Sequence, residues 1–161
     1  MIKIDSRQTA LDYADRGWSV LPLKPRMKDP HFDLVKGAYL GATTDKELIN
    51  FWFDVDPHAN IGIACVTSGL IVVDIDFRNG GEYFDELGET YTVKTGDGFH
   101  YYYKIDAGLS VRGNLGDGID IKYKGYVAAA PSTHPNGSIY EVVSDIEPIQ
   151  ITGELLEMVK K

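Results

Sequence analysis

The feature that most constrains the fold is a run of apolar residues that ends in two acids. Residues 70–73, Leu-Ile-Val-Val, are followed by Asp74-Ile75-Asp76. The run predicts a buried strand, and the alternation of a strand places Asp74 and Asp76 on one face, with Ile75 on the other. Two carboxylates one pleat apart repel each other, and their burial is unfavourable without a compensating charge. The pattern therefore predicts either a site for a hard divalent cation such as Mg²⁺ or Mn²⁺, or a strand that ends in solvent at two acids.

Composition narrows the class of protein. The chain has 161 residues, 24 acidic and 16 basic side chains and a formal net charge of −8. Its length suits one domain with its own core. Cys65 is a single cysteine, which excludes an internal disulfide and a Cys-rich zinc module. Residues 1–10 lack a signal-peptide core, and we find no apolar run near the roughly 18 residues of a membrane span. We therefore expect an intracellular, cytoplasmic protein without a membrane partner.

The acidic charge is unevenly placed. Residues 41–93 hold ten acidic and two basic side chains, whereas residues 1–40 and 94–126 each hold a small basic excess. An acidic chain at first argues against nucleic acid, because phosphates attract Lys and Arg. The segregation is compatible with a carboxylate metal centre between basic walls, and equally with a solvated acidic surface. Net charge alone therefore does not exclude nucleic acid as a partner, and it does not establish a metal site.

Turn and periodicity signals predict an α+β domain with several largely antiparallel strands. Ser6 is placed to cap a first helix that Gly17 ends, and residues 44–47 form a capping box for a second. Pro22 indicates an edge strand. The predicted helices cover residues 6–16, 44–53, 81–87 and 152–161. The predicted strands cover residues 18–23, 61–65, 70–76, 91–94, 99–105, 118–123, 126–129 and 138–143. Three pairs of consecutive strands are expected as hairpins, with turns at residues 68–69, 95–98 and 124–125.

Three further segments carry candidate functional side chains. On the predicted strand at residues 118–123, Asp120 and Lys122 share one face, so the strand either adds a third carboxylate and a phosphate-binding ammonium or carries a surface ion pair. The turn at residues 95–98 is either an ordinary hairpin turn or a close approach for a nucleotide that presents His100. Residues 130–137, with Ser132 and His134, and the loop around Lys28 either contact phosphate or serve as connections.

The order of these motifs is more specific than any one of them. Asp74-Ile75-Asp76, Gly98-Phe99-His100 and Asp120-Ile121-Lys122 resemble the three motifs of archaeo-eukaryotic primases. More closely, the chain resembles the amino-terminal domain of the bifunctional DNA primase–polymerases (prim-pols) of plasmids, phages and mobile elements. The resemblance also covers residues 13–14, 17–23, 28–30, 42–44, 60–63, 125–132, 134–137 and 140–141. It departs from the family where Gly98 replaces a serine and Ala130 replaces a common second proline.

The resemblance implies a fold and an activity. The fold is an RNA-recognition-motif-like, mostly antiparallel sheet with an additional α/β unit and a cleft between them. The activity is template-directed transfer of nucleotides from NTPs or dNTPs, with single-stranded or primed DNA as the template. Residues 1–161 would be one catalytic domain excised from the amino terminus of a larger replication protein, with a downstream helicase or accessory domain.

The resemblance also implies roles for single residues. Asp74 and Asp76 would bridge two Mg²⁺ or Mn²⁺ ions, with no zinc in this segment, and Asp120 would complete the metal nearer the primer 3′-hydroxyl. His100 would contact the incoming triphosphate. The secondary phosphate contacts would be Lys122, Ser132, His134 and Lys28.

Two alternatives remain on the sequence alone. An apolar strand ending in DxD also serves other metal-dependent nucleotidyl and glycosyl transferases, although that reading leaves His100 and Asp120 unexplained. The chain is otherwise a nucleotide- or nucleic-acid-binding module without catalysis. If it is a primase–polymerase domain, its acidic charge predicts weak DNA binding with a shallow salt dependence.

Overall fold

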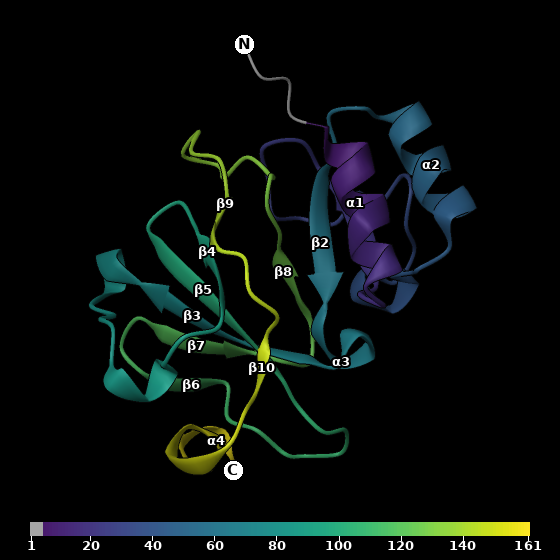
Figure 1. Ribbon diagram of the computed structural model, residues 1–161. Helices are drawn as coiled ribbons and strands as arrows, with labels where there is room; N and C mark the ends of the chain where they lie inside the picture. Colours follow the sequence, from purple (N-terminus) through teal and green to yellow (C-terminus); the bar gives the residue numbers. More distant parts are fainter. Residues whose placement is uncertain (1–4) are drawn as a thin grey trace.

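Two sheets divide the strands between them in this computed structural model, which describes residues 5–161 (Figure 1). The larger sheet has the order β6-β7-β3-β5-β4-β9, and β10 pairs in parallel with the end of β5. The smaller sheet has the order β1-β2-β8. The strands of the large sheet are β3 (Leu70–Asp76), β4 (Tyr91–Lys94), β5 (Gly98–Lys104), β6 (Asn114–Gly116), β7 (Ile119–Lys122), β9 (Glu141–Ser144) and β10 (Ile149–Gln150). Those of the small sheet are β1 (Val20–Leu23), β2 (Asn60–Ala64) and β8 (Tyr126–Ala128).

Helices cover both sheets from outside. α1 lies beside β2 and α2 lies beside α1, whereas α4 lies at the opposite end of the molecule, near β6 (Figure 1). The α-helices are α1 (Ser6–Asp15), α2 (Lys46–Val55), α3 (Cys65–Ser68) and α4 (Gly153–Val159). The 3₁₀ turns are η1 (Ala38–Gly41), η2 (Phe77–Asn79) and η3 (Asp85–Leu87). The predicted α+β class is therefore confirmed.

The apolar run of β3 is buried on both faces, which explains why it does not alternate. Ile71, Val73 and Ile75 belong to a core cluster that includes side chains of α4. Leu70 and Val72 belong to a second cluster, shared with α1, α2 and the small sheet. Each of these five side chains is at most 1% exposed. Asp74 and Asp76 lie on the same side of β3 as Leu70 and Val72, so they face toward the small sheet.

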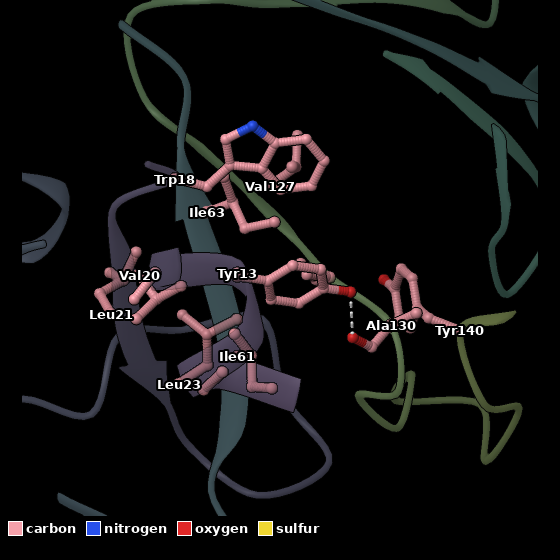
Figure 2. Close-up of a cluster of buried hydrophobic side chains, with 14 of the residues drawn as sticks. Tyr13, Trp18, Val20, Leu21, Leu23, Ile61, Ile63, Val127, Ala130 and Tyr140 are labelled. Atoms are coloured by element: carbon pink, nitrogen blue, oxygen red, sulfur yellow. Dashed lines mark hydrogen bonds between the residues drawn. The ribbon is translucent and has the colours of Figure 1, made fainter. Parts of the chain in front are cut away.

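The second cluster joins α1 to the small sheet and to the loop after β8. Tyr13 of α1 stacks on Trp18 at a ring distance of 5.6 Å. Its hydroxyl donates a hydrogen bond of 2.6 Å to the carbonyl of Ala130, and Tyr140 lies next to this contact (Figure 2). The tyrosine thus ties the first helix to the loop that leads toward β9, 117 residues later.

Two of the three expected hairpins are wrong. β3 does not pair with β2, and β8 pairs with β2 rather than with β7. The connection after β2 is the helical turn α3, which carries the chain from one sheet to the other. At residues 124–125 the chain crosses back, since the carbonyl of Gly125 accepts from the backbone N–H of Cys65. The third hairpin, β4 with β5, is confirmed, and β1 is an edge strand as Pro22 indicated.

Several element ends differ from the prediction. Asp5, not Ser6, caps α1 by accepting from the N–H of Gln8, and Asp45, not Thr44, caps α2. A helix over residues 81–87 is reduced to η3, because Gly81 lies against the backbone of Gly118 and the chain is not helical there. The strand predicted at residues 138–143 is observed as β9, at Glu141–Ser144. The helix predicted at residues 152–161 is observed as the shorter α4, at Gly153–Val159.

Two further features of the described residues concern Cys65 and the helices. Cys65 is fully buried, and burial raises the pKa of its thiol to about 12, so this cysteine serves packing and not nucleophilic chemistry. Within residues 5–161, the helices are all too short or too polar to cross a membrane.

Candidate active site

The three sequence motifs meet in one row at the centre of the large sheet. β3 pairs antiparallel with β5 on one side and with β7 on the other, and Asp74 lies opposite both His100 and Asp120. Directly opposed residues of neighbouring strands point to the same face. His100 Nε2 lies 3.5 Å from Asp74 Oδ1. Strand register therefore brings together three side chains that are far apart in the sequence.

Asp76 lies one pleat further along β3, where the strand ends. Its carboxylate accepts from the backbone N–H of Arg78 at 3.1 Å and from Asn79 Nδ2 at 2.6 Å, which makes it the cap of η2. Its backbone N–H donates to the carbonyl of Gly118, and its carbonyl accepts from Gly81. A Cβ on Gly81 would lie 2.2 Å from that Gly118 carbonyl oxygen, so only glycine permits this approach. The backbone of Asp76 is thus held on both sides.

Asp74 is ionised at neutral pH. Burial acts to raise the pKa of its carboxyl, but the hydrogen bond and charge of His100, together with Lys122 and Lys28, outweigh burial and lower it. The third acid, Asp120, is more open, with a side chain 57% exposed and Lys122 Nζ at 3.9 Å from its Oδ2. The row thus runs from a partly buried carboxylate that pairs with His100 to a solvated one.

A cavity of about 430 Å³ lies between this row and the small sheet. Asp74, His100 and Lys122 line it from the large sheet, and β8 lines it from the other. A smaller hollow of about 50 Å³ adjoins it at the end of β3, where Asp76, Arg78 and His134 contribute. Lys28, Asp74, His100 and Tyr140 line both spaces.

His134 is fixed in orientation and charge state by the loop that carries it. The backbone N–H of Asn136 donates to His134 Nδ1 at 3.0 Å, which leaves the proton of the neutral ring on Nε2. Burial, aided by the charge of Lys28, lowers the pKa of His134 below its ordinary value. The ring packs so closely on Gly96 that a Cβ there would lie 2.4 Å from it. His134 is therefore a neutral hydrogen-bond donor beside the smaller hollow.

Ser132 does not reach the cavity, which corrects the expectation of a phosphate contact. It is 2% exposed, and its hydroxyl oxygen accepts from the backbone N–H of Ile61 at 2.8 Å. The same hydroxyl donates to the Ile61 carbonyl at 3.2 Å. Both hydrogen-bonding functions of Ser132 are used to join the loop after β8 to β2.

Gly98 also has a structural explanation. It pairs with Asp76 across β3 and β5, and a Cβ at this position would lie 1.8 Å from the carbonyl oxygen of Ile75. No side chain fits there, so the serine that the resemblance would place at this position has no room in this chain.

Three side chains that sequence reasoning did not assign to the site belong to it. Tyr140 packs between the rings of His100 and His134, at 6.0 and 5.8 Å. Arg78 lines the smaller hollow. Tyr126 lines the larger cavity and donates a 2.6 Å hydrogen bond to the carbonyl of Lys28, which holds the Lys28 loop in place. Their positions depend on strand pairing across the two sheets, which local patterns do not report.

Comparison with known families decides the relationship. The family model for the bifunctional DNA primase/polymerase, N-terminal domain matches residues 10–153. The chain belongs to this family. No curated protein matches it at a significant level. The primase–polymerase domain thus falls in a family of DNA-directed nucleotidyltransferases, and its matched region contains all three acids.

The family is typically metal-dependent, and the three acids of this primase–polymerase domain are its candidate ligands. Their carboxylate oxygens are the hard donors that Mg²⁺ and Mn²⁺ prefer, they share one face, and Asp74 is ionised. Their side chains are not gathered, however: in residues 5–161 no three His, Cys, Asp or Glu groups converge closely enough to hold an ion. The donor chemistry therefore fits a divalent cation. In this structure the Asp76 carboxylate accepts hydrogen bonds from η2, and the Asp120 carboxylate pairs with Lys122.

Proposed function

We propose that this domain catalyses template-directed transfer of a nucleotide from an NTP or dNTP to a 3′-hydroxyl, in the replication of a plasmid, phage or mobile element. The observation that carries the proposal is the row formed by Asp74, His100 and Asp120, with Asp76 one pleat away. Family membership supports the reaction class. The larger cavity beside the row supports a substrate that is both charged and partly apolar.

Asp74, Asp76 and Asp120 are the residues that would hold the metal ions. Two such ions, when bound, stabilise the charge on the attacking and leaving oxygens of an in-line displacement at the α-phosphate. His100 Nε2 lies 3.5 Å from Asp74 Oδ1, so His100 orients this carboxylate. The ring also lines the cavity, and its contact with the incoming triphosphate stays part of the proposal. No covalent nucleophile is needed for this chemistry.

Lys28, Lys122 and the Nε2–H of His134 are the proposed phosphate contacts. Lys28 and Lys122 line the larger cavity, and Lys28 and His134 line the smaller hollow. The neutral imidazole N–H and a neighbouring ammonium group can both donate hydrogen bonds to negatively charged phosphate oxygens. We leave Ser132 out of the proposed site because both its hydrogen bonds serve the backbone.

The experiment is primer extension by residues 1–161 with a primed DNA template, dNTPs and Mg²⁺ or Mn²⁺. Extension is expected from the unaltered chain and should be lost in Asp74→Ala/Asp76→Ala. The matched control is Glu154→Ala/Glu157→Ala, which removes the same charge from exposed acids of α4, and it should extend normally. Extension that survives in the Asp74→Ala/Asp76→Ala variant would overturn the proposal. Transfer from a nucleotide sugar, in place of extension, would favour a glycosyl transferase.

We also propose that DNA is held weakly by this domain alone. The chain carries eight more acidic than basic side chains, and few phosphate contacts give a shallow dependence of affinity on salt. A helicase or accessory domain in the complete replication protein would then supply most of the affinity for the DNA template. A steep decrease in DNA affinity with added salt would contradict this part of the proposal.

A further inference from the structure

An ion pair between Arg78 and Asp97 closes one side of the smaller hollow. Arg78 Nε lies 3.1 Å from Asp97 Oδ2, and both residues line the hollow together with Asp76 and His134. We propose that this pair is a latch: Asp97 holds the Arg78 guanidinium when no nucleotide is bound, and a phosphate group of the nucleotide takes the place of Asp97. The inference rests on the proposed function, since it adds a binding residue and a competing carboxylate to the same site.

The backbone on both sides of the pair is fixed, so the exchange requires only side-chain movement. The backbone N–H of Phe77 donates to the carbonyl of Asp97 at 2.9 Å. The N–H of Arg78 donates to the Asp76 carboxylate. The turn that carries Asp97 is tied to the His134 loop by Asn136 Nδ2, which donates to the carbonyl of Gly96 at 3.0 Å. The guanidinium and the carboxylate are thus anchored beside the hollow by neighbouring turns.

The chemistry of the two partners favours replacement. A guanidinium binds carboxylate and phosphate with the same planar fork of N–H donors, and phosphate offers more charge and more acceptor oxygens. The Arg78 side chain is 69% exposed and that of Asp97 37% exposed. Ion pairs this open contribute little to stability, so little is lost when the pair separates.

The charges that line the smaller hollow are consistent with a phosphate-binding role for Arg78. Three carboxylates line this space, those of Asp74, Asp76 and Asp97, against the cationic groups of Lys28 and Arg78. An anionic ligand near Asp76 needs a cation on that side, and Arg78 is two residues along the chain. Asp97 neutralises this cation in the free domain, so it competes with the ligand and also repels it.

Nucleotide binding tests the latch without requiring catalysis. The unaltered chain, Arg78→Ala, Arg78→Lys and Asp97→Asn are titrated with dATP in the presence of Mg²⁺, and inorganic tripolyphosphate is used as a competitor. Loss of a charge-assisted contact should weaken dATP binding about tenfold or more in Arg78→Ala, and Arg78→Lys should restore part of this. Removal of the competing carboxylate should tighten binding about two- to fivefold in Asp97→Asn. Tripolyphosphate should follow the same order.

Two controls make the test specific. Arg7 and Asp54 form another partly exposed ion pair, between α1 and α2, so Arg7→Ala and Asp54→Asn should leave dATP affinity unchanged. In the Arg78→Ala background, Asp97→Asn should tighten binding less than it does in the unaltered chain, because only the repulsion between Asp97 and the ligand is then removed. An equal gain of affinity in both backgrounds would overturn the latch. A gain of affinity in Asp97→Asn has no explanation in misfolding.

The outcomes separate the latch from the proposed function. Unchanged dATP affinity in Arg78→Ala, or weaker binding in Asp97→Asn, overturns the latch even if the domain extends primers. If the domain does not extend primers but its nucleotide affinity changes as expected, the polymerase proposal fails and the latch stands.

Discussion

The two sheets contribute differently to the cavity they enclose. The large sheet provides charged and titratable groups, through Asp74, His100 and Lys122. The small sheet provides its edge strand β8, with an aromatic ring, two small apolar side chains and no charge among Tyr126, Val127 and Ala128. The charged groups thus come from the large sheet and the apolar wall of the cavity from the small sheet. We therefore expect mutations in the large sheet to reduce activity and mutations in the small sheet to reduce stability.

The largest expected effect is the loss of activity in Asp74→Asn. We expect primer extension to fall by more than about a hundredfold, since even outer-shell groups of metal sites are worth about ten- to a hundredfold. The free energy of unfolding should change by less than about 1 kcal/mol, because the cost of burying the carboxylate and its attraction to His100 largely cancel. Extension assays and urea denaturation measure the two quantities separately. A large loss of stability would show that the charged row also holds the sheet together.

The reverse pattern is expected in the small sheet. Ile63 of β2 is fully buried, and truncation to alanine should reduce the free energy of unfolding by about 2–5 kcal/mol. The fraction that remains folded should extend primers at the normal rate. Ile63→Val, which removes one methylene, should cost about 0.5–1.5 kcal/mol. Loss of activity in well-folded Ile63→Ala would break the division between the two sheets.

Ser132→Ala examines the loop that joins the sheets. Removal of the hydroxyl leaves the buried N–H of Ile61 without its acceptor, which should cost about 1–3 kcal/mol of stability. The KM for dNTP should not change, because the hydroxyl does not face the cavity. A raised KM at unchanged stability would instead return Ser132 to the phosphate contacts.

The smallest expected effect concerns pH. The pKa of His134 is lowered in the folded chain, chiefly by burial, whereas the unfolded value is near 6.5. As pH falls from about 6.5 toward the folded pKa, the unfolded chain binds more protons and the free energy of unfolding decreases. Below the folded pKa this contribution changes no further. His134→Asn, whose side-chain oxygen is placed to accept from the Asn136 N–H, should lose this dependence in urea titrations at pH 7 and pH 5.5.

The sequence predicted individual strands more accurately than their partners. A continuous apolar run located β3, and alternation and turn residues located β4, β5 and β7, to within a few residues, because these signals are local. The expected pairing of β7 with β8 failed, because Lys124-Gly125 is equally suited to a tight turn and to a crossing between sheets. The choice depends on hydrogen bonds to Cys65 and β2, some 60 residues earlier.

The candidate site shows the same limit. The order of the three motifs identified Asp74, His100 and Asp120, which register then brought into one row. Ser132 was misplaced because a hydroxyl beside a proline looks the same whether it faces a cavity or a neighbouring backbone. Tyr140 and Arg78 lacked a distinguishing local pattern, since their importance arises from contacts between separate loops and strands.

The double pairing of β3 also limits how this sequence can change over evolution. Side chains alternate along a strand, so an insertion or deletion of one residue in β3 would turn Asp74 and Asp76 toward the α4 core and Ile75 toward the cavity. Because Asp74 is matched to β5 and to β7, a compensating change in one neighbour would leave the other out of register. The strand can therefore tolerate substitutions, but it cannot tolerate an insertion or a deletion. Descendants should vary in length in the connections around it, such as residues 24–42 and 105–113.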